Sequence, residues 1–494
     1  MNNQSEVRVR MAPSPTGFFH VGSARTALFN WLFAKHHKGK FILRVEDTDV
    51  ERSSEEMIKI VLEGMAWLGM NKYEGPYFQS KRIDLYKEYI KKLLETGKAY
   101  YCYCDPQDLE KERRAAYARK EDWKYDRRCL SLSDADKEKK NRSNTPKAVR
   151  FLVPEHGVTY KDIVYGEISR DFKNIEDFII QRANGMPTYN LVCVVDDYEM
   201  GITHVIRGAD HITNTPKQIL LYEALNLQKP EFAHLPLILG KDKSKLSKRH
   251  GAVSLDEYKK KGFLSDAMVN YLALLSWSPG DDNEDFMDRK KPENLGTVDM
   301  VRLAKEFTLE RVNKANAIFD VTKLEWMNQQ YIHQLNHEKF QESLKPFIIK
   351  HGLMTEETLI RNHQRYVEIC NLMQPRLKTL DEINNRGRYF FKDDFDYDQT
   401  ALQKFTNRET LTIMKTFLPV IQNINPFEVM NIEITLVKFG EDHGLKVKQW
   451  IHPLRVFTTG TKAGPPLFDI LEMIGKERCI NRIEKILKQK QESK

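Results

Sequence analysis

The chain has 494 residues, of which 41% are hydrophobic and 30% charged, and its formal net charge is +8. This composition is typical of a folded protein of about three domains, and it excludes a disordered or collagen-like chain. No apolar run reaches the roughly 18 residues of a membrane span, and the N-terminal MNNQSEVRVR lacks the apolar core of a signal peptide, so we expect a soluble, cytoplasmic protein without membrane contact.

The first hundred residues alternate strand and helix patterns. Residues 7–11 alternate apolar and basic side chains, residues 21–37 place apolar side chains at helical spacing, and residues 41–45 form an apolar run. Strand, helix and strand in this order predict a βαβ unit, and therefore a parallel sheet.

The middle of the chain interrupts this rhythm and then resumes it. Residues 106–150 are charged and poor in apolar side chains, which indicates an insertion. Beyond Tyr189 we predict strands over residues 190–197 and 203–208, and a helix that opens at Thr215-Pro216.

From about residue 265 onward strand patterns fade, and the C-terminal third is predicted to be helical. Apolar residues recur at helical spacing over 340–348, 429–439, 467–474 and 480–487. Pro346 predicts a break in the first of these helices.

Basic residues concentrate in two windows. Residues 111–150 hold 14 Lys/Arg against 7 Asp/Glu, and residues 241–261 hold 8 against 3. Local basic surfaces on an otherwise near-neutral chain indicate phosphate-bearing partners, although such runs are also found on merely solvated faces.

Charged residues end the predicted strands. Arg10, Glu46, the pair Asp196 and Asp197, and Arg207 each fall at a strand end. Ligands of open parallel sheets bind at these carboxyl ends. Two arginines and a carboxylate suit a ligand with two anionic groups and one cationic group, such as an acidic amino acid. The alternative is that these charges only pair with one another at the rim of the sheet.

Two loops carry phosphate-binding features. In PSPTGFFHVGS, Gly17 and Gly22 allow close approach of a phosphate, the following helix N-terminus favours an anion, and His20 supplies a donor. In KLSKR, Lys245 and Lys248 are three residues apart, so both can reach one polyphosphate.

These two loops resemble the "HIGH" and "KMSKS" signatures of class I aminoacyl-tRNA synthetases. The segments RMAPSPTG, FILRVEDTD, PTYNLVCVVDDYEMGITHVIRG and KLSKRHGAVS resemble those of bacterial glutamyl-tRNA synthetases, and the resemblance covers the first 330 residues. It implies an α/β fold: a Rossmann-like parallel-sheet catalytic domain with an inserted acceptor-binding domain, followed by an all-α C-terminal anticodon-binding region.

The resemblance also implies a division into domains. Residues 1–100 and 189–244 would form the two halves of the catalytic domain, and residues 101–188 the inserted domain that binds the acceptor end. Residues 245–339 would hold the KMSKS-like loop and a helical stem-contact domain. Residues 340–494 would form the helical anticodon-binding region, in two subdomains.

The same resemblance assigns roles to individual residues. It implies catalytic roles for His20, Lys245 and Lys248, and ATP binding by Thr16, Gly17, His20, Gly22, Ser23 and Lys248. Ser23 stands where many relatives of this class have a second histidine. The implied glutamate-binding positions are Arg10, Ala12, Ser14, Glu46, Tyr189 and Arg207. Arg10 with Tyr189 would take the side-chain carboxylate, Glu46 with Ser14 and Ala12 the ammonium group, and Arg207 the α-carboxylate.

The implied reaction uses ATP and Mg²⁺ to join L-glutamate to tRNA-Glu through a glutamyl-adenylate, and the enzyme is expected to be a monomer. One alternative is a glutaminyl-tRNA synthetase, but that family resembles an all-β protein at its C-terminus. Another is a non-catalytic tRNA-binding homologue, which would be expected to have damaged signatures, yet His20, Gly22, Lys245 and Lys248 are all present.

Six cysteines are too few for a disulfide framework. Structural zinc requires four ligands. Relatives with zinc here end the motif in Cys-x-His, a pattern that Ser131 breaks, whereas a related tRNA-modifying branch uses Cys-x-Cys with Tyr-x-x-x-Cys. The matching set in this chain is Cys102, Cys104, Tyr125 and Cys129. The alternative is a decayed site with free thiols.

Overall fold

A computed structural model describes residues 6–14, 19–48, 54–244, 246, 254–280, 284–288 and 294–492. The chain divides into two compact units. The first unit comprises Met1–Glu257, Val269–Phe286 and Asp299–Asp320, and the second comprises Tyr258–Met268, Met287–Val298 and Val321–Lys494. In the described residues, no helix is both long and apolar enough to cross a membrane.

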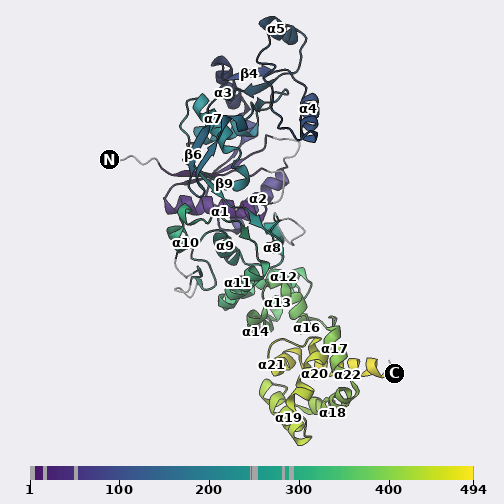
Figure 1. The fold of residues 1–494 in the computed structure, drawn as a ribbon. Coiled ribbons are helices and arrows are strands. Elements are labelled where there is room, and N and C mark those ends of the chain that lie inside the picture. Colours follow the sequence, from purple (N-terminus) through teal and green to yellow (C-terminus); the bar gives the residue numbers. More distant parts are fainter. Residues whose placement is uncertain are drawn as a thin grey trace. The chain divides into compact units, whose positions relative to one another are not determined.

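Parallel strands organise the first unit (Figure 1). β2 (Lys40–Val45) pairs in parallel with β1 (Arg8–Met11) and β3 (Glu74–Phe78). β10 (Glu231–Leu235) pairs in parallel with β9 (His204–Gly208) and β6 (Val158–Asp162), and β7 (Gly166–Arg170) adds an antiparallel edge. The amide of Thr203 donates to the carbonyl of Arg8, so β9 runs beside β1. The predicted parallel sheet is confirmed.

Helices bury these strands. α1 (Val21–His36) packs against β1, β2 and β9 and is buried over most of its surface, as the 21–37 pattern predicts. α3 (Ile83–Glu95), α6 (Tyr189–Glu199) and α7 (Thr215–Ala224) share one hydrophobic cluster with Ile42 of β2 and Val205 of β9.

The predicted insertion consists of two surface helices between strands. β4 (Ala99–Cys102), β5 (Ala148–Phe151) and β8 (Ile179–Gln181) form an antiparallel sheet. α4 (Pro106–Ala118) and α5 (Asp134–Arg142) lie between β4 and β5 in the sequence. This arrangement accounts for the loss of strand periodicity over 106–150.

The strand predicted over residues 190–197 is wrong, because these residues form α6. All residues from Leu191 to Asp197 are buried, and an apolar run that is buried on every side has no alternation to distinguish a strand from a helix. The helical conformation places Cys193 and Asp197, four residues apart, on one face of α6.

Helices make up most of the second unit. α12 (His337–Lys350), α19 (Val429–Asp442), α21 (Leu467–Ile474) and α22 (Lys476–Glu492) confirm the predicted helical segments. The break predicted at Pro346 is wrong, because α12 continues through it, anchored by fully buried Phe340, Leu344 and Ile348. Across the two units, the other described α-helices and strands are α2 (Glu55–Trp67), α8 (Leu255–Lys260), α9 (Ser265–Ala273), α10 (Met300–Glu306), α11 (Val321–Gln334), α13 (Glu356–Arg361), α14 (His363–Met373), α15 (Ile383–Arg386), α16 (Arg388–Phe391), α17 (Gln399–Phe405), α18 (Arg408–Asn423), α20 (Val447–Thr459), β11 (Ile238–Leu239) and β12 (Ala317–Ile318).

Candidate active site

A cavity of about 550 Å³ lies in the first unit where β1, β2 and β9 end. Its wall includes nine of the residues that the sequence predicts to bind glutamate or ATP: Arg10, Ala12, Ser14, His20, Gly22, Ser23, Glu46, Tyr189 and Arg207. The other four predicted residues, Thr16, Gly17, Lys245 and Lys248, lie outside the described residues. The structure thus brings distant parts of the sequence together around one cavity.

The N-terminus of α1 forms one wall of the cavity. His20 caps this helix: its Nδ1 accepts from the amide of Ser23 at 3.2 Å, and its Nε2 lies 3.1 Å from Ser23 Oγ. A Cβ atom at Gly22 would lie only 3.1 Å from the His20 ring, so a side chain there would crowd the cap. The free amides and positive end of a helix dipole favour an anion beside this wall.

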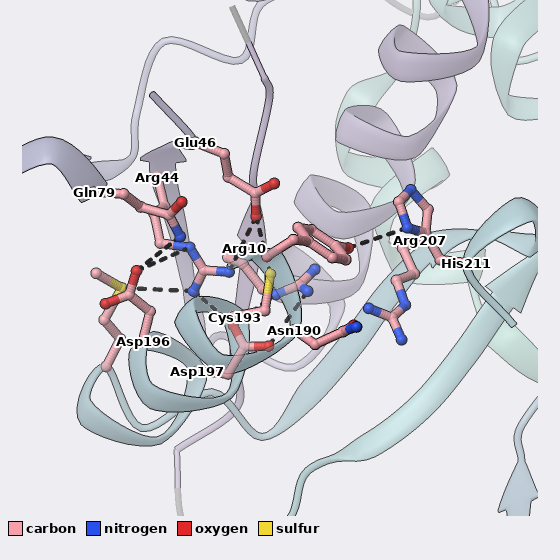
Figure 2. A network of polar contacts seen from close by, with 12 residues as sticks. Arg10, Arg44, Glu46, Gln79, Asn190, Cys193, Asp196, Asp197, Arg207 and His211 are labelled. Atoms are coloured by element: carbon pink, nitrogen blue, oxygen red, sulfur yellow. Dashed lines mark hydrogen bonds and ion pairs between the residues drawn. The ribbon is translucent and has the colours of Figure 1, made fainter. Parts of the chain in front are cut away.

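A buried network of charges connects Arg10 and Glu46 of the cavity wall with Arg44, Asp196 and Asp197 (Figure 2). Arg10 holds Asp197 with two nitrogens, at 3.0 and 3.4 Å, and Arg44 Nη1 lies 2.6 Å from the same carboxylate. Burial alone would raise the pKa of Asp197, but the two arginines outweigh it and the pKa is lowered. Arg44 also lies 3.6 Å from Glu46 and 3.7 Å from Asp196. Arg10 thus pairs with Asp197, another of the charges at the predicted strand ends, but it also lines the cavity, so this pairing does not exclude contact with a ligand.

Glu46 faces the cavity from the end of β2. Burial raises its pKa, while Arg44 and Arg10 act in the opposite direction. The thiol of Cys193 donates to Glu46 Oε1 at 3.3 Å. Glu46 is thereby oriented but keeps acceptor capacity for a cationic group.

Arg207 contributes a guanidinium to the wall, in addition to those of Arg10 and Arg25. Its side chain is only 6% exposed. Within the described part of the chain it has no carboxylate within ion-pair distance, and its buried Nη1 makes no hydrogen bond. A buried cation without a direct counterion is a strong attractor for an anionic ligand.

Tyr189 and His211 both line the cavity. Tyr189 Oη lies 3.1 Å from His211 Nδ1. Burial, together with the positive charge of Arg207, lowers the pKa of His211 to about 4, so the imidazole is neutral at pH 7. Burial raises the pKa of Tyr189, which keeps its hydroxyl protonated.

The predicted metal-binding residues also meet in space. The sulfur atoms of Cys102, Cys104 and Cys129 all lie within 4.8 Å of one another. Tyr125 Oη lies 3.6 Å from Cys102 Sγ and 3.5 Å from Cys104 Sγ. Burial raises the pKa of Cys102, but hydrogen bonds from Arg150, the amide of Cys104 and Tyr125, together with the charge of Arg150, outweigh it, so the pKa of this thiol is lowered.

A second cavity, of about 330 Å³, lies within the second unit. Within the described residues its wall carries no carboxylate. Its basic residues are Arg376, Arg386, His452, Arg455 and Lys462. Such a wall suits a polyanion.

Sequence reasoning missed several residues that position the site. Arg44 lies inside an apolar strand, and the presence of a charged residue in an apolar run was the one feature of the sequence that could have identified it. Cys193 and His211 had no local signal. His234 and Asp162, which support Arg207, are 72 residues apart in the sequence and meet only in the folded chain.

Comparisons with known proteins place the chain in a family. The family described as "tRNA synthetases class I (E and Q), catalytic domain" matches residues 6–326, and the family described as "Anticodon binding domain" matches residues 339–487.

Relatives match over nearly the full length. "Glutamate--tRNA ligase 2" of Caldicellulosiruptor saccharolyticus is 44% identical over 97% of this chain and 98% of its own, and "Glutamate--tRNA ligase" of Thermodesulfovibrio yellowstonii is 45% identical over 97% and 99%. A crystal structure of a glutamate tRNA ligase from Elizabethkingia meningosepticum, in complex with its amino acid, matches with a TM-score of 0.82 and 33% identity over 98% of this chain and 99% of that one. The chain thus belongs to the class I tRNA synthetases for glutamate and glutamine, and among them to the glutamate–tRNA ligases.

Proposed function

We propose that this chain attaches L-glutamate to the 3′ end of tRNA-Glu through a glutamyl-adenylate, with ATP as the energy source and AMP and pyrophosphate as products. The observation that carries the proposal is the buried guanidinium of Arg207, without a direct counterion among the described residues, in a cavity shared with Arg10 and Glu46. The guanidinium groups of Arg10 and Arg207 and the carboxylate of Glu46 complement the two carboxylates and the ammonium group of glutamate.

Each group of glutamate then has a partner. Arg207 takes the α-carboxylate, and Arg10 with Tyr189 takes the side-chain carboxylate. Glu46, with Ser14 and the carbonyl of Ala12, takes the ammonium group. Asp197 holds Arg10 in a fixed orientation through two hydrogen bonds, which favours recognition of a planar carboxylate over an amide.

The protein contributes positioning and charge to the reaction. Arg207 holds the α-carboxylate for in-line attack on the α-phosphate of ATP, while the N-terminus of α1 and His20 bind the phosphates. Mg²⁺ binds mainly to substrate phosphates and water, and Asp210 on the described cavity wall adds a carboxylate to that donor set. When bound, Mg²⁺ offsets the charge of the triphosphate. Lys245 and Lys248 are proposed to hold the triphosphate from the KMSKS-like loop.

The cysteine cluster fits a structural zinc ion. Three sulfur atoms and one phenol oxygen give the four ligands that such a site requires, and the sulfur spacing of the cluster is compatible with one shared ion. When bound, zinc would join the end of β4 to the segment before α5. Cys102, Cys104, Tyr125 and Cys129 would hold it.

The basic cavity of the second unit is proposed to receive part of the anticodon arm. Its residues lie inside the segment that matches the anticodon-binding family, and arginine is well suited to phosphate and base edges. The domain boundaries, a monomeric state and a cytoplasmic location remain predictions from the sequence.

The proposal is tested by incubating the full-length chain with ATP, Mg²⁺ and total bacterial tRNA, with labelled glutamate or labelled glutamine in parallel. We expect ATP-dependent formation of glutamyl-tRNA and little labelling by glutamine. Preferential charging with glutamine would instead support the glutaminyl alternative. Absence of any charged tRNA would support a non-catalytic homologue. Pyrophosphate exchange with and without tRNA shows whether glutamate activation depends on tRNA.

A further inference from the structure

On its buried side, Arg207 is linked by hydrogen bonds to His234 and, through it, to Asp162. The proposed reaction gives neither residue a role. Arg207 Nε donates to His234 Nε2 at 3.2 Å, and His234 Nδ1 lies 2.6 Å from Asp162 Oδ2. His234 is 0% exposed and Asp162 is 1% exposed. The three side chains therefore form a continuous buried series from the end of β6, through β10, to the cavity wall on β9.

The hydrogen bonds fix the protonation state of His234. A guanidinium has only donors, so His234 Nε2 must accept from Arg207 and cannot carry a proton, and the hydroxyl of Thr215, 3.0 Å from the same nitrogen, is then the donor of that pair as well. The ring proton therefore sits on Nδ1 and is donated to Asp162. Burial lowers the pKa of His234. Asp162 raises this pKa and the positive charge of Arg207 lowers it, and the net shift is downward, so the ring is neutral at pH 7.

Asp162 is itself held rigidly. Its Oδ1 accepts from the amides of Val164 at 2.9 Å and Tyr165 at 2.8 Å, and its Oδ2 accepts from the amide of His234 at 3.1 Å. The carboxylate is thus an anchor with a fixed direction.

The other edge of the guanidinium is held as well. Arg207 Nη2 donates to Thr215 Oγ1 at 2.7 Å and to Gln218 Oε1 at 2.8 Å. Among the described residues Nη1 has no partner. Every partner that the described residues offer Arg207 is neutral, so its orientation is fixed while its charge has no direct counterion among them.

We propose that His234 and Asp162 are positioning residues that orient Arg207 for the α-carboxylate of the amino acid. This inference rests on the proposed function and deepens it. A carboxylate paired directly with Arg207 would orient it equally well, but it would offset the charge that attracts the substrate. Asp162 fixes the orientation of the neutral imidazole, and the imidazole in turn fixes that of Arg207. The carboxylate of Asp162 is therefore separated from the guanidinium by the imidazole ring.

Two substitutions of His234 separate the two hydrogen bonds. In His234→Gln the side-chain oxygen reaches the former position of Nε2 and can still accept from Arg207. In His234→Asn the side-chain nitrogen occupies the former position of Nδ1 and can donate to Asp162, but the acceptor for Arg207 is lost. Both variants remove the ring, so both lose similar packing.

In full-length protein we expect His234→Asn to raise the KM for glutamate by roughly ten- to a hundredfold, which is the usual effect of losing one hydrogen bond to a charged group. The KM for ATP should remain unchanged. His234→Gln should stay within a few-fold of the unaltered chain. Equal KM values for glutamate in the two variants, or a lower melting temperature with no change in KM, would overturn the positioning role.

The unaltered chain gives a second readout that does not depend on variants folding. In its ¹⁵N spectrum with labelled histidine, assigned to His234, we expect a neutral ring protonated at Nδ1 between pH 7 and 8. A ring protonated at Nε2, or a charged ring, would overturn the inference, because neither can accept from Arg207. An unaltered chain that forms no glutamyl-tRNA would instead overturn the proposed function, so the two failures are distinguishable.

Discussion

Replacing Arg10 with glutamine tests whether this residue reads the side-chain charge of the substrate. Arg10 and Arg44 both hold Asp197, at 3.0 Å and 2.6 Å, and both are almost fully buried. Of the two, only Arg10 is among the described residues that line the cavity. Arg10→Gln and Arg44→Gln therefore form a matched pair that differs in access to the substrate.

The structure sets the size of the two effects. Breaking a buried ion pair by removing one partner typically costs about 3–5 kcal/mol. Because Arg44 still compensates Asp197 in the Arg10 variant, we expect a smaller loss of folding stability, about 2 kcal/mol. Loss of the contact between a guanidinium and the substrate carboxylate should cost a further 2–4 kcal/mol or so, roughly a thirty- to thousandfold drop in kcat/KM for glutamate.

The assay compares kcat/KM for glutamate and glutamine, together with the melting temperature, in both variants. A site built around a required polar partner discriminates by about 10⁴–10⁵, and Arg10→Gln should narrow this ratio sharply. Arg44→Gln should lower the melting temperature at least as much while leaving the ratio intact. An Arg10 variant that is destabilised but retains its glutamate-to-glutamine ratio would refute the recognition role.

Three further predictions follow from other parts of the chain. The purified protein should contain about one zinc ion, and Cys104→Ser should lose both this ion and some thermal stability. Cys370→Ser, at a buried cysteine outside the cluster, should retain the zinc. Purified protein that contains no zinc, and whose melting temperature does not change in Cys104→Ser, would support a decayed site. Arg376→Gln should weaken tRNA binding and reduce the slope of log Kd against the logarithm of the salt concentration by about one. An unchanged slope would show that the basic cavity does not contact the RNA. Since the pKa of His211 is lowered to about 4 from an ordinary value of about 6.5, the unfolded chain binds more protons between these values, and stability should fall as the pH drops through this range. His211→Gln should flatten that part of the curve of melting temperature against pH, and an unaltered curve would show that His211 is not its cause.

The sequence was most informative where a pattern has one structural solution. The apolar side chains at helical spacing over residues 21–37 predict α1, and the apolar run before Glu46 predicts β2. Charged residues at the ends of such strands identify Arg10, Glu46 and Arg207, because parallel strands bring their carboxyl ends together.

The sequence was misleading where burial is complete. Residues 190–197 read as a strand because a run buried on every side carries no period. As a helix, α6 points Asp197 at Arg10 and Cys193 at Glu46, a geometry that a strand with alternating faces would not provide.

Local sequence patterns could not predict residues that orient the site from distant parts of the chain. Asp162 and His234 are ordinary residues in two separate strands, and only the pairing of β6 with β10 makes them neighbours. The isolated basic residues around the second cavity likewise come from several helices and loops, so their spacing carried no signal.

The central claim is that one cavity reads all three charged groups of glutamate, and a crystal structure of the full-length protein with bound glutamate tests it most directly. The claim predicts the α-carboxylate against Arg207, the side-chain carboxylate against Arg10 and Tyr189, and the ammonium group against Glu46. Glutamate bound outside this cavity, or with both carboxylates turned away from Arg10 and Arg207, would contradict it.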